Sequence, residues 1–318
     1  MIIRFGYVAM ALQIPEGSPN KTITVTNLLK IPQQEDRLNR LRRLVKVNLE
    51  NQLRVLKYNK GNEIYVFRFT SKLIPLATHE IAEGWDYLEE FRQQLLEIGS
   101  YIKDSKMRVS AHPDHFTLLN SPKAEVITAS LKDLEYHADL FDAMGLGSEA
   151  KLVLHVGGLY KDKELSLKRF KDNFALLPGN IKHRLIIEND DKSYNAADVL
   201  KLCSQLELPM VLDVHHHVCC NNGKSLSELL PAIFATWREL PPKIHFSSPK
   251  DAKNIRAHAD YINIRDFTKF LKTAKECCDK DLDVMIEAKQ KDKALHALMK
   301  ELAAIPDVRA VGQAAIEY

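Results

Sequence analysis

The chain has 318 residues with 45 basic and 42 acidic side chains, so its charge is nearly balanced and it lacks the global basic field of a general nucleic-acid binder. Its five cysteines show no CxxC spacing, which excludes a disulfide framework or zinc ribbon and is typical of a reducing compartment. No apolar run approaches the roughly 20 residues of a membrane span, and the short run at 1–12, interrupted by Arg4, predicts a first strand rather than a signal peptide.

Eight apolar β-type runs alternate along the chain with amphipathic helical stretches. The runs span 2–8, 64–69, 107–111, 152–156, 185–188, 210–214, 244–247 and 282–287. Helical periodicity fills most of the intervals, for instance 36–58, 85–103, 124–144 and 165–177. Eight strand–helix units in this length predict a single-domain α/β fold over residues 1–318, a (β/α)₈ TIM barrel. The alternative is a doubly wound open sheet, but no glycine-rich nucleotide loop follows any strand.

The sixth run ends in one carboxylate and three imidazoles, Asp213-Val214-His215-His216-His217. A buried carboxylate among neutral imidazoles carries a large desolvation cost unless a cation or a hydrogen-bond network compensates it. The pattern therefore favours metal binding over a solvated histidine-rich loop. Because side chains alternate along an extended chain, we expect His215 and His217 to pack beside the site rather than to bind the metal.

Similar residues recur at six consecutive strands. Each run from the third to the eighth places His, Asp or Glu at or just beyond its carboxyl end, where a barrel gathers its active-site groups into one mouth. Any one of them can be a core histidine or a helix cap, but six strands in succession favour a metal cluster at this mouth. The candidate ligands are His112, His155, Glu188, Asp213, His216, His245, His258 and Glu287. Shared ligands require Glu188 and Glu287 to lie within about 12 Å of each other.

The size and chemistry of this ligand set indicate more than one ion. It exceeds the positions of a single ion, so we expect two or three divalent ions, with Glu188 and Asp213 as bridges. Nitrogen and oxygen donors suit Mn²⁺, Zn²⁺ or Mg²⁺. Clustered ions of this kind serve phosphoester hydrolysis, because one lowers the pKa of a bound water and the others stabilise the attacking and leaving oxygens. Lys243, on the same side of its strand as His245, is expected to face either the phosphate or a carboxylate.

Several short motifs carry a family resemblance over residues 1 to about 290. They are Arg-Phe-Gly-Tyr at 4–7, Ser-Lys-Leu-Ile-Pro-Leu-Ala-Thr-His at 71–79, His-Pro at 112–113, Leu-His-Val-Gly-Gly at 154–158, Glu-Asn-Asp at 188–190, Asp-Val-His-His at 213–216, Lys-Ile-His at 243–245 and Glu-Ala-Lys at 287–289. In this order they resemble the ultraviolet damage endonuclease family, UvsE or UVDE, of the bacterial type. The resemblance implies a fold similar to endonuclease IV, a TIM barrel with three divalent metals.

The resemblance also implies an activity. Such enzymes nick DNA immediately 5′ to cyclobutane pyrimidine dimers and 6-4 photoproducts, and also attack abasic sites, without ATP. The incision leaves a 3′-hydroxyl and starts an alternative excision repair. We therefore expect damaged double-stranded DNA as the partner of this chain, Mn²⁺ as the preferred metal, and a monomer without an obligate protein partner. The expected location is the bacterial cytoplasm, with the enzyme on the nucleoid when it acts.

Position by position, the resemblance implies three metal sites. The first site holds His112, His155 and Glu188. The second holds Glu188, Asp213, His245 and Glu287. The third holds His216 and His258, and Asp260 is close enough to His258 in sequence to join it. Lys243 matches a family lysine that can be chemically modified, which would turn a cation into an anion. His79 is expected to shuttle a proton or to bind phosphate.

Lesion recognition is implied at three further positions, Tyr7, His115 and Phe116. A lesion that stacks and pairs poorly is cheaper to extrude from the duplex, and planar side chains can fill the gap. Family members carry Gln-Tyr in place of His115-Phe116, so stacking would survive here while a hydrogen bond from the tyrosine hydroxyl would not. Backbone phosphates are expected to meet lysines in loops, namely Lys21, Lys72, Lys161, Lys163, Lys250 and Lys253.

Two other functions are open. An abasic-site endonuclease of the endonuclease IV type would need no pyrimidine dimer. A sugar isomerase or epimerase on the same barrel would need one or two metals and a closed sugar pocket. The size of the ligand set and an open mouth with an insertable His115-Phe116 pair favour DNA.

Overall fold

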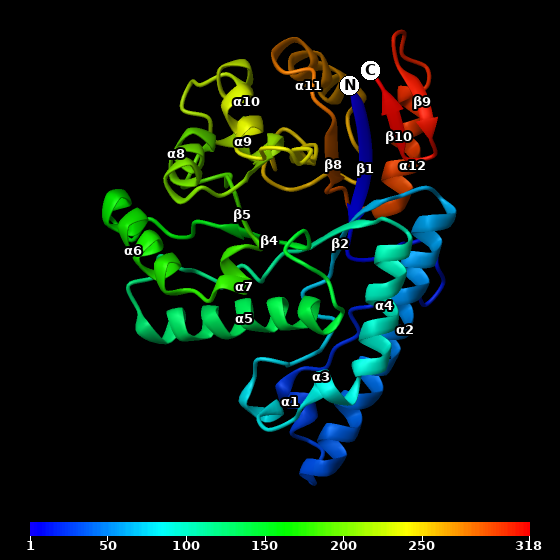
Figure 1. Ribbon diagram of the computed structural model, residues 1–318, viewed down its shortest axis with the longest axis vertical. Helices are drawn as coiled ribbons and strands as arrows, with labels where there is room; N and C mark the ends of the chain where they lie inside the picture. The colour runs from blue at the N-terminus through cyan, green and yellow to red at the C-terminus, as the bar shows by residue number, and fades with distance from the viewer.

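A computed structural model describes all residues, 1–318, and contains a closed barrel of eight parallel strands surrounded by helices (Figure 1). Strands β2 to β8 pair in chain order, and β1 pairs with both β8 and β2. This closure confirms the predicted TIM barrel and excludes the doubly wound sheet. The strands are β1 (Ile2–Val8), β2 (Val66–Phe69), β3 (Arg108–Ala111), β4 (Lys151–His155), β5 (Leu185–Glu188), β6 (Met210–Asp213), β7 (Lys243–Phe246) and β8 (Leu282–Ile286).

Helices fill the connections between the strands. They are α1 (Val25–Leu28), α2 (Gln34–Gly61), α3 (Tyr87–Glu90), α4 (Arg92–Asp104), α5 (Ala124–Ala143), α6 (Lys163–Leu176), α7 (Gly179–Lys182), α8 (Ala196–Leu206), α9 (Val214–Cys219), α10 (Leu226–Ala235), α11 (Ile264–Cys277) and α12 (Lys291–Leu302), with a 3₁₀ helix η1 (Glu80–Ala82). The helix expected at 85–103 is divided into α3 and α4 at Phe91, whose backbone leaves the helical region. None of these helices has both the length and the apolar composition needed to cross a bilayer.

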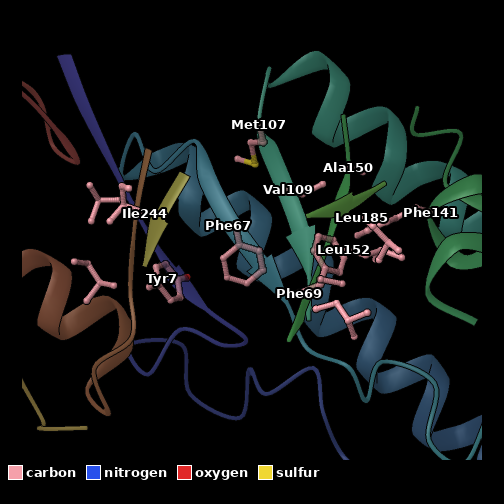
Figure 2. Close-up of a cluster of buried hydrophobic side chains, with 14 of the residues drawn as sticks. Tyr7, Phe67, Phe69, Met107, Val109, Phe141, Ala150, Leu152, Leu185 and Ile244 are labelled. Carbon is pink, nitrogen blue, oxygen red and sulfur yellow. The ribbon is translucent and has the colours of Figure 1, made fainter. Parts of the chain in front are cut away.

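Each barrel strand has an outer and an inner face, because successive side chains point to opposite sides. The outer faces pack against the helices in one large apolar core, part of which includes Tyr7, Phe67 and Leu152 (Figure 2). The inner face is partly apolar, with one cluster of Val153, Ile186, Val211 and Trp237 and another of Val8, Val66 and Met285.

The inner face at the amino-terminal ends of the strands carries a buried ion-pair network. Asp283 of β8 is fully buried and accepts hydrogen bonds from Arg4 Nε at 2.7 Å and Nη2 at 2.9 Å, and from Arg108 Nη1 at 2.5 Å. The Arg108 guanidinium lies 5.1 Å from the ring centre of Trp237. A buried carboxylate is tolerated when it is paired in this way. The network therefore forms a floor that closes the barrel at the end opposite the mouth.

A carboxyl-terminal hairpin adds two strands that the sequence did not predict, β9 (Arg309–Gly312) and β10 (Ala315–Glu317). Strand β10 pairs antiparallel with Ile2–Arg4 of β1, whereas Gly6–Val8 of β1 pairs with β2. The strands are short and β9 is largely exposed, so neither has the apolar run that marks a barrel strand.

Gly6 allows the close approach of β1 and β2. A Cβ atom at this position would lie 2.1 Å from the carbonyl oxygen of Val66, a backbone atom that cannot move aside. We predict that Gly6→Ala lowers the free energy of unfolding by about 3 kcal/mol, as overpacking does. Urea unfolding measures this change. Gly61→Ala is the matched control, since a Cβ there meets nothing within 4 Å; a similar loss in both variants would contradict the steric explanation.

Candidate metal centre

The inner face of the barrel becomes polar at the carboxyl-terminal ends of the strands. His155 lies opposite Glu188 in the β4–β5 register, and Asp213 lies opposite His245 in the β6–β7 register. All four residues are on inward-facing positions of adjacent strands. The strand alternation that buries apolar residues lower in the barrel therefore brings these side chains into one layer at the mouth.

Glu188 is the centre of this layer and is only 1% exposed. Its Oε1 is 2.9 Å from His245 Nδ1 and 3.7 Å from His216 Nδ1. Its Oε2 is 3.4 Å from His112 Nε2 and 3.6 Å from His155 Nε2. One carboxylate is thus surrounded by four imidazoles, which lie in β4 and β7, directly after β3, and in the helix that follows β6.

Two more carboxylates complete the cluster. Asp213 is fully buried, with Oδ2 3.7 Å from His216 Nδ1, and Glu287 Oε1 is 3.2 Å from His245 Nδ1. Three groups have donor atoms within 4.8 Å of one another: His112, His155 and Glu188; Glu188, Asp213 and His216; and Glu188, His245 and Glu287. Glu188 belongs to all three. Glu188 and Glu287 therefore lie well inside the expected 12 Å.

The implied pairing of His216 with His258 in a third site does not match this arrangement. His216 is grouped with Glu188 and Asp213, on the β6 side of the mouth. His258 belongs to none of the three groups; its Nδ1 is 4.0 Å from Glu287 Oε2, and its ring centre is 5.5 Å from that of His215. The structure thus places His258 at the edge of the cluster, beside Glu287.

The chain after β6 is helical, so the extended geometry assumed for His215 to His217 is wrong. Asp213 caps α9 by accepting a hydrogen bond from the backbone N–H of His216 at 2.7 Å. In a helix, successive side chains point about 100° apart, which separates His216 from its neighbours. His215 and His217 are each only 4% exposed, and His215 Nε2 donates to the carbonyl of Ile255 at 2.7 Å. Both are packing residues beside the cluster, as expected, but for a different geometric reason.

Backbone carbonyls fix the orientation of three of the imidazoles. The Nδ1 atoms of His112, His216 and His258 lie 2.8, 2.9 and 2.7 Å from the carbonyl oxygens of Pro113, Asn189 and Glu287, respectively. Because a carbonyl oxygen only accepts hydrogen bonds, each Nδ1 is the protonated donor. In the neutral ring, Nε2 then carries the lone pair that a metal binds, which is the usual arrangement of metal-binding histidines.

Two residues that support the cluster were not identified from the sequence. The Asn189 side chain donates to the carbonyl oxygen of Asp213 at 3.0 Å and accepts from its N–H at 2.9 Å, which fixes the end of β6. Arg68 of β2 forms a buried ion pair with Glu287 Oε1. Arg68 is a basic residue within the apolar run of β2, and this is the feature of the sequence that could have indicated it. Arginine is not a metal-binding residue type, so the pattern of His, Asp and Glu residues did not include it.

The electrostatics of the cluster favour added positive charge. Burial, reinforced by Glu188 and Glu287, raises the pKa of Asp213 well above its ordinary value. Burial also opposes ionisation of Glu188, but His245 and His155 outweigh it and hold the pKa of Glu188 well below its ordinary value. Glu188 Oε2 and Asp213 Oδ2 are buried without any hydrogen-bond partner. Buried oxygens without a partner fit divalent cations, and Glu188 Oε2 also lies 3.4 Å from the unprotonated Nε2 of His112.

Lys243 and His79 lie outside the cluster. Lys243 is fully buried and donates to Ser110 Oγ at 2.9 Å, so its partner is neither of the two expected groups. Burial, reinforced by Arg108, lowers the pKa of Lys243 well below its ordinary value. His79 caps η1 by accepting from the N–H of Ile81 at 3.1 Å. It lines a separate pocket with four acidic residues, Glu80, Glu83, Glu135 and Asp139, which disfavours contact with a phosphate.

Tyr7 does not reach the surface, so the prediction that it contacts a lesion is wrong for this structure. It faces outward from β1 into the apolar core (Figure 2) and is 0% exposed. Its hydroxyl donates a hydrogen bond to Asn59 Oδ1 of α2 at 2.6 Å. Its ring packs edge-on against Phe67 with ring centres 5.2 Å apart. The strand alternation that turns Arg4 and Gly6 inward turns Tyr7 outward.

His115 and Phe116 are exposed in the loop after β3. Phe116 is 44% exposed, and its ring centre is 6.2 Å from that of His115. His115 also lines a groove that includes His112 and His155 of the cluster and is bordered by the loops after β3, β4 and β5. This loop is therefore placed where a ligand in the groove can meet both the aromatic pair and the cluster.

Glu188 offers a direct test of metal binding, since it belongs to all three donor groups. We predict that Glu188→Gln, which keeps the shape but removes the charge, weakens Mn²⁺ binding at least about tenfold. Equilibrium dialysis with metal analysis measures the bound Mn²⁺. Glu90→Gln is the control, because Glu90 pairs with Arg42 and Trp85 away from the cluster. Equal Mn²⁺ binding by wild type and both variants would contradict a metal centre at Glu188.

Comparisons with known proteins show which family the chain resembles. The family model described as UV-endonuclease UvdE matches residues 3–318. The UV DNA damage endonuclease of Bacillus thuringiensis subsp. konkukian (strain 97-27) is 41% identical over 320 residues, covering 100% of both chains. The UV DNA damage endonuclease of Halalkalibacterium halodurans is 43% identical over 320 residues, covering 100% of this chain and 99% of that one.

Solved structures also show similarity to an ultraviolet damage endonuclease. The crystal structure of SacUVDE has a TM-score of 0.83 at 34% identity and covers 95% of this chain and 100% of that chain. Endonuclease IV from Thermus thermophilus has a TM-score of 0.57 at 11% identity, covering 95% of this chain and 100% of that one, which shows a shared fold. The match over almost the whole chain, at this identity, leads to one conclusion: the chain belongs to the UV-endonuclease UvdE family.

Proposed function

We propose that this chain is a metal-dependent DNA repair endonuclease that nicks DNA immediately 5′ to ultraviolet photoproducts, without ATP, and that also attacks abasic sites. The single observation that carries the proposal is the buried Glu188 among four imidazoles at the mouth of a barrel of this family. The substrate is damaged double-stranded DNA, and the product carries a 3′-hydroxyl. We also propose that it acts as a monomer in the bacterial cytoplasm.

The residues of the cluster have separable tasks in this proposal. Glu188, Asp213 and Glu287, with the imidazoles of the mouth, would hold two or three divalent ions, Mn²⁺ in our proposal. Such ions supply Lewis-acid activation of water and neutralise the charge that develops on a phosphate during hydrolysis. The backbone carbonyls behind the imidazoles keep their orientation fixed, so less reorganisation is needed during the reaction.

Lys243 supports the cluster from below in this proposal. It lies on the inward face of β7, one inward position before His245, and is too buried to meet a phosphate at the mouth. Its neighbourhood favours the neutral amine. The neutral amine is the form that would react in the lysine modification that the family resemblance implies. That His79 shuttles a proton or binds phosphate stays a prediction.

The loop after β3 would recognise the lesion. His115 and Phe116 are exposed beside a groove that leads to the cluster, so their planar rings can fill the gap left by an extruded dinucleotide. Phe116 has no hydroxyl, so its contribution would come from stacking and apolar contact. Recognition at this loop would therefore depend on the shape of the distorted duplex more than on a hydrogen bond from position 116.

Nicking of supercoiled plasmid tests the reaction. We expect purified protein with Mn²⁺ to relax ultraviolet-irradiated plasmid and to leave unirradiated plasmid intact, and we expect a chelator to abolish the cut. Mapping on a defined dimer should place the nick directly 5′ to it. Cutting of depurinated plasmid alone would instead indicate an enzyme of the endonuclease IV type. Intact DNA in every reaction, with Mn²⁺ bound to the protein, would contradict the nuclease proposal.

Phe116→Ala tests lesion recognition. Stacking of a base on an aromatic side chain is worth about 1–3 kcal/mol, so we predict about 5- to 150-fold weaker binding to dimer-containing duplex. Fluorescence anisotropy with and without the dimer measures this change. Leu176→Ala is the matched control, because Leu176 is an 81% exposed apolar residue at the end of α6. An equal effect on damaged and undamaged duplex would argue against a role in lesion recognition.

A further inference from the structure

Arg68 lies inside the barrel on β2, a strand that contributes no imidazole or carboxylate to the metal centre. Its register partners are Val8 on β1 and Ser110 on β3. Because β1 lies between β2 and β8 in the barrel, the Arg68 side chain reaches Glu287 across β1. The side chains of the pair are only 13% and 12% exposed. Arg68 therefore approaches the cluster from the wall that lacks metal-binding residues.

The two oxygens of Glu287 have different surroundings. Oε1 is held by Arg68 Nη1 on one side and lies 3.2 Å from His245 Nδ1 on the other. Oε2 is 4.0 Å from His258 Nδ1, beyond hydrogen-bond distance. A carboxylate with one oxygen fixed cannot rotate freely, so the other oxygen is presented in one direction.

The other cations on the inner face of the barrel have other partners. Arg4 and Arg108 bind Asp283 at the floor, Lys243 donates to Ser110, and Lys151 donates to the carbonyl of His183. Among the ion pairs of the structure, the Arg68–Glu287 pair is the one that joins a guanidinium to a carboxylate of the cluster. Its task is therefore local to Glu287.

We propose that Arg68 is a positioning residue, which holds the Glu287 carboxylate in a fixed orientation toward the divalent ion that Glu188, His245 and Glu287 would bind. The inference rests on the metal centre of the proposed function. Arginine suits this task because its guanidinium is planar and permanently charged. Removing a partner that orients a ligating group costs about 10- to 100-fold in metal affinity or activity. The guanidinium also repels an ion, but Glu287 offsets that charge, so we expect the loss of orientation to dominate.

The test is Mn²⁺ binding by the full chain, measured by equilibrium dialysis and by electron paramagnetic resonance, without DNA. We expect Arg68→Met to weaken one class of bound Mn²⁺ about 10- to 100-fold, and Arg68→Lys to weaken it less, since lysine keeps the charge but not the planar geometry. Arg4→Met is the control, because it breaks an arginine–carboxylate pair at the floor, away from the cluster. This control should leave Mn²⁺ binding unchanged, and circular dichroism checks the fold of each variant.

A double-mutant cycle separates positioning from a general structural effect. If Arg68 acts through Glu287, Arg68→Met should change Mn²⁺ binding little once Glu287→Gln is present. Additive effects in the cycle, or unchanged or tighter Mn²⁺ binding in Arg68→Met, would overturn the inference. If Arg68→Met does not fold, Arg68→Lys decides, and wild-type affinity in that variant overturns the inference. Mn²⁺ binding that depends on Arg68, in a protein that leaves irradiated plasmid intact, would overturn the proposed reaction and leave this inference standing.

Discussion

The burial of three carboxylates at one end of the barrel is the constraint on which the rest of the structure depends. Glu188, Asp213 and Glu287 occupy one layer with little access to water, and buried like charges are unstable unless positive charge is close to them. Arg68 compensates Glu287, and imidazoles surround Glu188. Asp213 is left with a strongly raised pKa and an unpartnered oxygen. The mouth is therefore built with a deficit of positive charge that divalent ions can supply.

The remainder of the barrel makes this arrangement possible. The floor, where Arg4 and Arg108 neutralise Asp283, closes the interior at one end. Above it, apolar side chains such as Val153 and Ile186 fill the space between floor and mouth. The outer faces of the same strands pack against helices and supply most of the core. The residues that stabilise the fold therefore lie on the outer strand faces and in the lower part of the barrel, whereas the polar cluster lies on the inner face at the carboxyl-terminal ends, as is usual for this fold.

The residues on the surface around the mouth lie on a different kind of element from the residues of the cluster. The cluster lies at the strand ends or in the residues directly after them, whereas the exposed aromatic pair lies farther out on a loop, where side chains can adapt to a bound molecule. Tyr7 does not belong to this surface, because its side chain is buried in the contact between β1 and α2. His115 and Phe116 then remain as the aromatic candidates for lesion contact among the residues that the family resemblance indicated.

The sequence by itself indicated the barrel, the family and most of the histidines and carboxylates that meet at the mouth. All eight barrel strands begin and end within two residues of the predicted runs, because a buried parallel strand needs a continuous apolar run and leaves a local pattern. Strand ends of a barrel must converge, so the candidate ligands followed from the strands. Only the tertiary structure decided which side chains meet. The outward turn of Tyr7, the capping of α9 by Asp213, the Arg68–Glu287 pair and the pairing of β10 with β1 all depend on contacts between distant segments or on local hydrogen bonds, neither of which an apolar pattern encodes.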